Sequence, residues 1–315
     1  MQSFKPINVL VLLAVGTVAA SSFLFMKILV EQIPPSEIVA GRVFFGAVAL
    51  AAFIRIKRTP LNLSRSLMVR VSIFAALETV IPFTLIATAE QKVDSGLAAV
   101  LISSMPLFTV LFATLTPTDE RLSRMGFVGL AVGFLGIVVL SGVGSDALLN
   151  GDALSRIAVV AAGASYAAAG VYARLQLKTE NTLSVSGLQL GMATLLAVPL
   201  VFASGETPSF GLSPGGWGAL LTLGIVGSGG MLLGFLWLVE KTGSIGASLV
   251  TYVVPFMGVF LGWAVLGETI GDRTVLGLVL VLAGVGVATF GGILTASSSR
   301  RSEKLPAPTL QGDAA

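Results

Sequence analysis

Cysteine and histidine are both absent from this sequence, and charged residues are scarce. The lack of cysteine excludes disulfides, thiol chemistry and cysteine-based metal sites. The lack of histidine removes the commonest general base, metal ligand and proton switch near neutral pH. We therefore expect no metal, no cofactor and no catalytic residue, and any coupling to protons must use a carboxylate. The sequence also has no phosphate-binding loop, which disfavours an ATP-driven pump.

The scarcity of charge decides the broad class of the protein. Only 11% of the 315 residues are charged, whereas 55% are hydrophobic, and the mean hydropathy is +0.94. A soluble domain normally carries about 25% charged residues. So few charges cannot cover a surface that faces water, but a surface that faces lipid needs none. The composition therefore predicts a membrane protein.

Long apolar runs separated by short polar or proline-containing breaks occupy most of the chain. An α-helix needs about 20 apolar residues to cross the hydrocarbon core of a bilayer. We expect an all-α membrane protein of ten transmembrane helices, with no soluble domain between them. The first run is too long for a cleaved signal peptide and lacks its basic flank. The runs lie near residues 7–30, 37–54, 69–89, 95–116, 125–142, 154–174, 183–203, 214–239, 245–266 and 274–295.

The basic residues gather on one side of these predicted helices. The connections on the side of the N-terminus, such as residues 55–70, hold most of the Lys and Arg residues, whereas the other side has few, among them Lys92, Arg156 and Arg273. Cytoplasmic loops carry such an excess of positive charge. We therefore expect a multi-pass protein of the cell inner (plasma) membrane with both termini in the cytoplasm. This asymmetry explains the sequence pI of 9.4 without a nucleic acid partner.

The two halves of the chain resemble each other. Residues 90–106 align with residues 239–255, so that Glu90 falls opposite Val239. Each half would hold five helices, and because five is odd, the second copy would enter the membrane from the opposite side. Such inverted repeats are common in secondary transporters. We expect a first repeat at 1–145, a second at 146–295 and a disordered cytoplasmic tail at 296–315. The aligned pairs include Lys92 and Lys241, Ser95 and Ser244, Ala98 and Ala247, and Pro106 and Pro255.

These features together resemble those of a known family. Besides the paired halves, they are the Pro34-Pro35 turn followed by Arg42, the stretch at 95–106, and the junctions at Glu120 and Glu268, each followed by a glycine-spaced helix. The chain resembles the drug/metabolite transporter (DMT) superfamily, in its ten-helix EamA-like branch. The resemblance implies movement of a small metabolite across the cytoplasmic membrane, often as efflux. It does not specify the substrate, because the family carries amino acids, sugars, nucleotide conjugates and drugs.

Glu78 is a carboxylate inside a predicted helix, about 12 Å from its cytoplasmic end at 1.5 Å per residue. A charge at this depth costs at least ~2.5 kcal/mol, so it persists where it faces water, a partner or a substrate. Desolvation would suit it to proton coupling. The ordinary interpretation is a protonated or paired structural residue. We expect Glu78 to lie in a central cavity and to carry protons.

Arg42 and Lys27 are the basic residues within or at the margin of predicted helices. Arg42 could neutralise Glu78, bind a substrate carboxylate, or extend its side chain to the outer surface. An outward-reaching side chain or a structural ion pair is the more ordinary interpretation. For Lys27 we expect a side chain that reaches the surface from the end of a helix.

The alignment of the halves places Gly227 and Ser228 opposite Glu78, in a run with four glycines at 224–230. Glycine weakens a helix and could free backbone groups for a ligand. Pro82 would interrupt the helix of Glu78 in the same way. Close packing of helices, which also uses glycine, is the alternative.

Further polar or amphipathic candidates for the cavity are Phe23, Tyr166, Gln189 and Tyr252. A buried tyrosine hydroxyl needs a hydrogen-bond partner, and a polar cavity supplies one. For Glu120 and Glu268 we expect capping of the next helix. Glycine-rich faces at 126–136 and 277–286 indicate helix packing, inside one chain or in a homodimer.

The sequence thus predicts a secondary transporter that moves a small, amino-acid-like or other organic solute by alternating access. Export as its direction is implied by the family resemblance alone. Proton coupling through Glu78 is one mechanism, and an uncoupled facilitator of the same fold is the alternative. A scaffold or sensor without transport activity would need neither a polar cavity nor an interrupted helix. An intramembrane enzyme would need a pair of catalytic groups, and the predicted helices offer one clear deep carboxylate.

Overall fold

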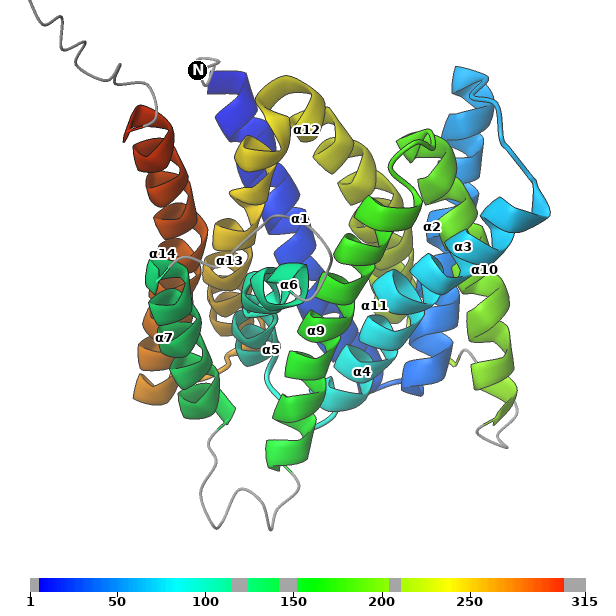
Figure 1. Cartoon of the computed structure of the whole chain (residues 1–315). Coiled ribbons are helices and arrows are strands. Elements are labelled where there is room, and N and C mark those ends of the chain that lie inside the picture. Colours follow the sequence, from blue (N-terminus) through cyan, green and yellow to red (C-terminus); the bar gives the residue numbers. More distant parts are fainter. Residues whose placement is uncertain (1–5, 115–123, 142–151, 204–210, 303–315) are drawn as a thin grey trace, which may run out of the picture.

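The computed structural model describes residues 6–114, 124–141, 152–203 and 211–302, and all regular structure in these ranges is helical (Figure 1). The predicted all-α class is therefore confirmed for the described part of the chain. The helices are α1 (Pro6–Val30), α2 (Pro35–Lys57), α3 (Arg65–Ala75), η1 (Ala76–Val80), α4 (Ile81–Glu90), α5 (Ser95–Ile102), α6 (Met105–Thr114), α7 (Arg124–Ser141), α9 (Asp152–Gln176), α10 (Thr182–Ala203), α11 (Pro214–Leu221), η2 (Thr222–Gly230), α12 (Met231–Ser248), α13 (Val250–Leu266) and α14 (Asp272–Ser302).

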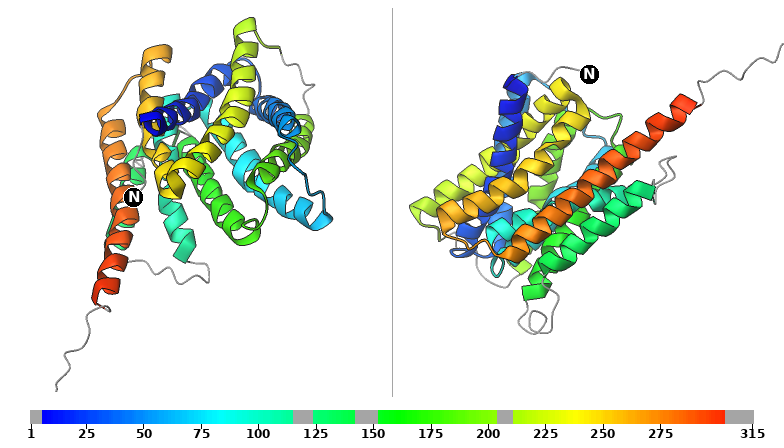
Figure 2. Two further views of the ribbon diagram at one scale, coloured as in Figure 1. Left: turned by 90° about the horizontal axis from the view of Figure 1, so that it is seen from above. Right: turned by 90° about the vertical axis from the view of Figure 1, so that its left-hand side faces the viewer.

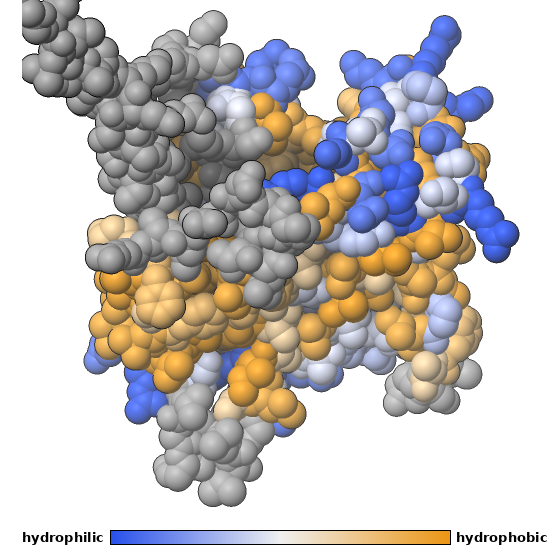
Figure 3. Space-filling model, in the orientation of Figure 1, coloured by the Kyte–Doolittle hydropathy of each residue, from blue (hydrophilic) through white to orange (hydrophobic). Residues whose placement is uncertain are grey.

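Several of these helices are long and apolar enough to cross a bilayer. Within the described residues there are seven, namely Pro6–Val30, Pro35–Lys57, Arg65–Ala89, Ser95–Phe112, Ala153–Gln176, Thr182–Ala203 and Pro214–Gly243, and two shorter apolar helices, Met125–Ser141 and Val250–Leu266. Large apolar side chains such as Phe127, Phe202 and Trp263 lie exposed on the outside. Figure 3 shows hydrophobic residues as a band across the molecule, with hydrophilic residues gathered above it. The protein is thus a multi-pass membrane protein.

Helices from the first 141 residues pack mainly against helices that follow residue 151. α1 packs on α13, α2 on α10 and η2, α4 on α9, and α7 on α14. The two views of Figure 2 show α7 and α14 side by side along one flank of the molecule, at a distance from the pair α2 and α10. The centre of the molecule is therefore shared between the early and the late part of the chain.

Helix α14 runs to Ser302, although the sequence predicts a disordered tail from residue 296. Its last turns therefore differ from the prediction. Once a helix is nucleated, each further residue adds one hydrogen bond, so a long apolar helix continues through the serines at 297–299. Residues 303–315 lie outside the described residues.

Two helices widen where the sequence predicts weak points. η1, at residues 76–80, and η2, at residues 222–230, are π-helical. A π-helical turn bonds each N–H to the carbonyl five residues earlier and often marks a functional position. Pro82 lies just after η1 and lacks an N–H, and η2 holds the four glycines. The predicted interruptions are thus real, but the helix widens and does not break.

Glycines bring α7 and α14 into close contact. A Cβ added at Gly284 would collide with the backbone of Gly133, and one at Gly129 would collide with the backbone of Ala288. Small residues allow such an approach between helices in lipid. Gly286, on the same helix α14, has no neighbour within 4 Å of an added Cβ. The glycines of this face therefore serve packing within the chain, with Gly286 as an exception.

This contact predicts different outcomes for two identical substitutions on one helix. Gly284→Ala should lower the free energy of unfolding by about 1–3 kcal/mol or more, because the clashing atoms belong to a backbone that cannot rotate away. Gly286→Ala, the matched control, should leave stability unchanged or raise it by about 0.5–1 kcal/mol through helix propensity. Thermal unfolding of the two purified variants in detergent measures both. Equal melting temperatures would contradict the packing described here.

Candidate functional site

A cavity of about 710 Å³ lies at the centre of the helices, within the about 300–1,000 Å³ typical of small-molecule sites. Its wall is formed by α1, α2, α3, η1, α4, the α5–α6 junction, α9, α10, η2, α12 and α13. The wall extends to the exposed Lys178 and to Glu180, where α9 is followed by α10. That is the end of the molecule at which α1 begins (Figure 1). The cavity therefore opens at the end that holds the N-terminus.

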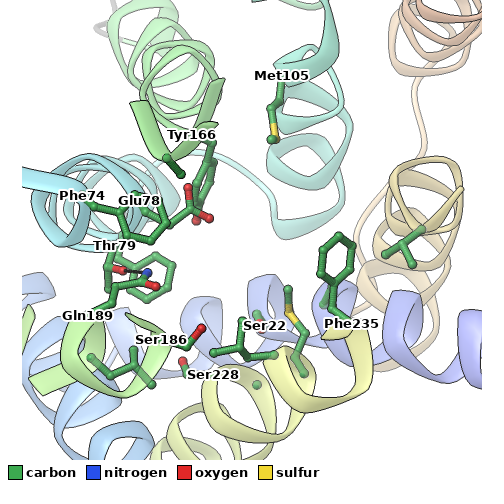
Figure 4. Close-up of a pocket in the computed structure, with 18 of the residues that line it drawn as sticks. Ser22, Phe74, Glu78, Thr79, Met105, Tyr166, Ser186, Gln189, Ser228 and Phe235 are labelled. Carbon is green, nitrogen blue, oxygen red and sulfur yellow. Dashed lines mark hydrogen bonds between the residues drawn. The ribbon is translucent and has the colours of Figure 1, made fainter. Parts of the chain in front are cut away.

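The structure brings most of the predicted site residues to this cavity. Glu78, Arg42, Phe23, Tyr166, Gln189, Gly227 and Ser228 all line it. Figure 4 shows Glu78 beside Tyr166 on one side and Ser22, Ser186 and Ser228 on another. These residues come from η1, α9, α1, α10 and η2, so the site exists only in the folded chain.

Arg42 is buried in the wall, with 6% of its surface exposed. Its Nε donates a hydrogen bond to Ser228 Oγ at 3.0 Å, and its guanidinium lies 3.6 Å from the ring centroid of Phe83. This stacking stabilises the charged guanidinium in the wall through a cation–π interaction. Arg42 thus neither reaches the outer surface nor forms an ion pair with any carboxylate among the described residues. Its Nη1 and Nη2 atoms have no hydrogen-bond partner there and are not sealed from the cavity.

Glu78 lies on η1, half-buried, with its side chain in the cavity. Its carboxylate points towards Tyr166 of α9 (Figure 4), and the two groups are close enough to interact electrostatically. The next residue, Thr79, is buried and accepts a hydrogen bond from Gln189 Nε2 at 2.8 Å. The π-helical turn therefore holds one side chain in the cavity and ties its neighbour to α10.

The rest of the wall is largely apolar. Phe74, Phe83, Met105, Met231 and Phe235 line it beside Phe23. The sequence did not predict these five, because an apolar side chain in a largely apolar helix gives no sign of which face borders a cavity. The combination of a polar group of residues with an apolar wall suits an amphipathic ligand.

Tyr252 differs from the prediction, because it does not line the cavity. Its neighbour Thr251 and Val254 do, while Tyr252 packs against the apolar core and its hydroxyl is buried without a partner in the described residues. Successive residues of a helix point about 100° apart, and here Thr251 turns towards the cavity while Tyr252 turns towards the core.

Lys27 and Glu268 also differ from the predictions. Lys27 does not reach for the surface, since its Nζ donates to the carbonyl oxygens of Glu90 and Val93 at the end of α4, at 2.7 and 3.1 Å. Glu268 caps α5 and not the next helix: it accepts hydrogen bonds from the N–H groups of Ser95 and Gly96 at 2.7 and 2.9 Å. Glu120 lies outside the described residues.

A model of the EamA-like transporter family matches two stretches of this chain, residues 6–142 and 154–290. The chain belongs to the EamA-like transporter family. Membership of the DMT superfamily follows, as the sequence resemblance indicates. This EamA-like transporter has, within its described ranges, no group of three or more acidic residues that could hold a metal ion.

Curated relatives of this EamA-like transporter are named as transporters. The "Uncharacterized inner membrane transporter YedA" of Escherichia coli is 29% identical, over 90% of this chain and 90% of the relative. The "Uncharacterized transporter YoaV" of Bacillus subtilis is 25% identical, over 89% and 95% of the two chains. The "Probable amino-acid metabolite efflux pump" of Salmonella typhimurium is 24% identical, over 89% and 93%.

A protein of known crystal structure shares the fold of this EamA-like transporter. It is 19% identical in sequence, and the comparison covers 90% of this chain and 98% of that chain with a TM-score of 0.61. At this identity the likeness concerns the fold alone. Family and relatives together indicate a membrane transporter, whose function requires a lipid bilayer and a small-molecule substrate.

Proposed function

We propose that this protein is a secondary transporter of small amphipathic metabolites that carry a carboxylate, such as amino acids. The observation that carries the proposal is the guanidinium of Arg42 at the cavity wall, with no carboxylate partner among the described residues. A buried charge is retained where it gains a partner. A guanidinium pairs with a carboxylate through two parallel hydrogen bonds, and the terminal nitrogens of Arg42 are free to form them.

The apolar part of the substrate would contact the aromatic and methionine side chains of the wall. Phe23, Phe74, Phe83 and Phe235 offer faces on which an apolar group can pack. The name of the Salmonella relative, an amino-acid metabolite efflux pump, agrees with this substrate class and with export.

Alternating access between two inverted five-helix repeats would move the substrate. The repeats at 1–145 and 146–295 would contribute ten crossings in all, with both termini in the cytoplasm of a cell whose inner membrane holds the protein. In that orientation the mouth beside Lys178 faces the cytoplasm, which is the side from which an exporter takes its substrate. The packing of early helices on late helices supports an arrangement in which the two repeats enclose one cavity.

Coupling to protons would use Glu78, the acid of the cavity wall at membrane depth. Export of the substrate would then be driven by protons that enter the cell. An uncoupled facilitator of the same architecture is the second candidate. Arg42 and the apolar wall support it, because these groups could bind and release a substrate without any proton.

Matched pairs of ligands test the proposal. Purified protein is heated with an aromatic or branched amino acid, or with the same compound whose carboxylate is replaced by a carboxamide. The acids should raise the melting temperature and the amides should not, because only the acids pair with Arg42. The compounds that stabilise are then followed into liposomes with and without a pH gradient. A protein that binds but does not move them is a sensor or scaffold, and no stabilisation by any acid contradicts the proposed substrate class.

A further inference from the structure

Glu90, the last residue of α4, is an acid that the proposed transport cycle does not use. It lies at the end of the molecule opposite the cavity mouth and does not line the cavity. Its exposed fraction is 0%, and both carboxyl oxygens are buried without a hydrogen-bond partner in the described residues. A charged group that is buried without hydrogen bonds is strongly unfavourable. This position therefore suits a neutral carboxyl group.

The basic groups around Glu90 and the nearby Asp94 donate their hydrogen bonds to other atoms. Lys27, from α1, donates to the main-chain oxygens of Glu90 and Val93 and not to the carboxyl group. Arg42, from α2, interacts with Glu90 only at a distance, because its Nε bonds Ser228 on the cavity side. Arg156, from α9, donates through Nη1 to the carbonyl of Leu140 at 3.3 Å. None of these three basic residues donates a hydrogen bond to the carboxyl oxygens of Glu90.

The acidic neighbours of Glu90 lie where the α13–α14 connection closes over α5. Glu268 from this connection accepts hydrogen bonds from the backbone of Ser95 and Gly96, and from Ser95 Oγ at 2.8 Å. Burial, and then the carboxylate of Glu268, raises the pKa of Asp94 above its ordinary value. Glu268 interacts electrostatically with Glu90 as well. This end of the molecule is therefore closed by contacts that surround an unpartnered acid.

The fold itself does not require an acid at this position. In the alignment of the two halves, Glu90 falls opposite Val239, which is apolar and partly buried on α12. At the position of the second half that corresponds to Glu90, the fold is thus formed with an apolar residue.

We propose that Glu90 is a proton-binding site that controls the gate at the closed end of the transporter. With the proton bound, the carboxyl group is neutral and this end stays shut, as in the present structure. Without the proton, the charged carboxylate drives this end to open to water and the cavity mouth to close. The inference rests on the alternating access proposed above, and it concerns regulation of that cycle from the side opposite the N-terminus.

The sign of the pH effect follows from linkage. The conformation that binds the proton more tightly is favoured at low pH. That conformation is the one with Glu90 sealed and the mouth beside Lys178 open. Low pH on the side of Glu90 should therefore hold the mouth open, and high pH should close it.

Because the chain has no cysteine, a single introduced thiol can be labelled without background from other cysteines. Ser186→Cys places one thiol in the cavity wall, and a membrane-impermeant sulfonated maleimide is added to inside-out vesicles on the side of the mouth. The pH of that bath is held constant while the pH of the vesicle lumen is changed. Raising the luminal pH from about 5.5 to about 8.5 should slow the labelling at least about threefold as the carboxyl group loses its proton.

Three further variants identify the group that responds. Glu90→Gln should label fast at every luminal pH, and so should Glu90→Val, which supplies the residue of the aligned position. Glu31→Gln removes an exposed acid near the same end and should keep the full dependence. A flat profile without any of these changes, or a dependence that persists in either Glu90 variant, overturns the proposal.

The same labelling separates the gate from the proposed function. A stabilising amino acid from the ligand test should change the rate of labelling if the protein alternates between two conformations. A response to the ligand but not to luminal pH overturns only the role of Glu90. A response to neither overturns alternating access itself.

Discussion

Arg42→Gln should lower the transport of carboxylate substrates about 10–100-fold at low substrate concentration, while the protein still folds. A hydrogen bond to a charged group contributes about 1.5–3 kcal/mol, and each 1.4 kcal/mol is about tenfold in affinity, so the substrate should bind about 10–100-fold more weakly. Glutamine keeps a hydrogen-bonding group near Ser228 but loses the charge and the stacking on Phe83. Flux into liposomes and the thermal stabilisation by ligand, measured on the same preparation, give both numbers.

Controls show whether position or charge alone matters at Arg42. Arg42→Lys keeps the charge but not the planar fork of donors, so it should recover only part of the affinity. Lys178→Gln removes another basic residue of the cavity wall, but one that is exposed at the mouth, and it should change binding little. If Lys178→Gln were as severe as Arg42→Gln, a general attraction of anions would explain both, and the specific role of Arg42 would be wrong.

Arg42 also shows how far the sequence could lead. Its place in an apolar run indicates a basic group at membrane depth, and the family resemblance points to the same residue. The surroundings of the side chain could not be predicted, because Ser228 is 186 residues away along the chain and Phe83 lies on another helix. A guanidinium that reaches water and one that is held in a cavity wall look the same in a sequence.

For Glu268, too, the sequence predicted the kind of interaction but not its partner. A carboxylate at a helix boundary predicts a cap, and capping is what it does. The sequence pointed to the following helix, whereas the capped helix is α5, 172 residues earlier at Gly96. Gly267, with φ +69°, turns the chain just before Glu268 and allows the carboxylate to point back. The type of interaction could be predicted from residue chemistry, but its partner depends on how the two halves pack.

The interrupted helices were more predictable, since their causes are local. Pro82 and the glycines at 224–230 act on their own helices, so the sequence could locate η1 and η2 within a few residues. That the interruption takes π-helical form, and that it directs Glu78 into the cavity and Thr79 towards Gln189, depends on contacts with α9 and α10. Local weakness was therefore predictable, and its geometric consequence was not.

Glu78→Gln should uncouple transport from the pH gradient. Glutamine has nearly the shape of glutamic acid but binds no proton in this pH range, so a carrier that exchanges one proton for one substrate loses its driving force. A gradient of about one pH unit is worth 1.36 kcal/mol, which supports at most about tenfold accumulation of substrate. Liposomes with the membrane potential clamped at zero should reach that ratio with the unchanged protein and a ratio near one with Glu78→Gln. Downhill exchange should continue in the variant, because Arg42 and the apolar wall remain.

Two outcomes would assign Glu78 a different role. Accumulation that persists in Glu78→Gln would remove the residue from proton coupling and favour another acid. Loss of downhill exchange together with accumulation would place Glu78 in substrate binding, where its neighbour Tyr166 and the amino group of a zwitterionic substrate become the relevant partners. Glu240→Gln, which removes an exposed acid paired with Lys241, should match the unchanged protein in both assays. A proton carrier is needed only for accumulation against the substrate gradient, whereas a substrate-binding residue is needed for downhill exchange as well. A variant that loses accumulation but keeps exchange therefore identifies Glu78 as a proton carrier.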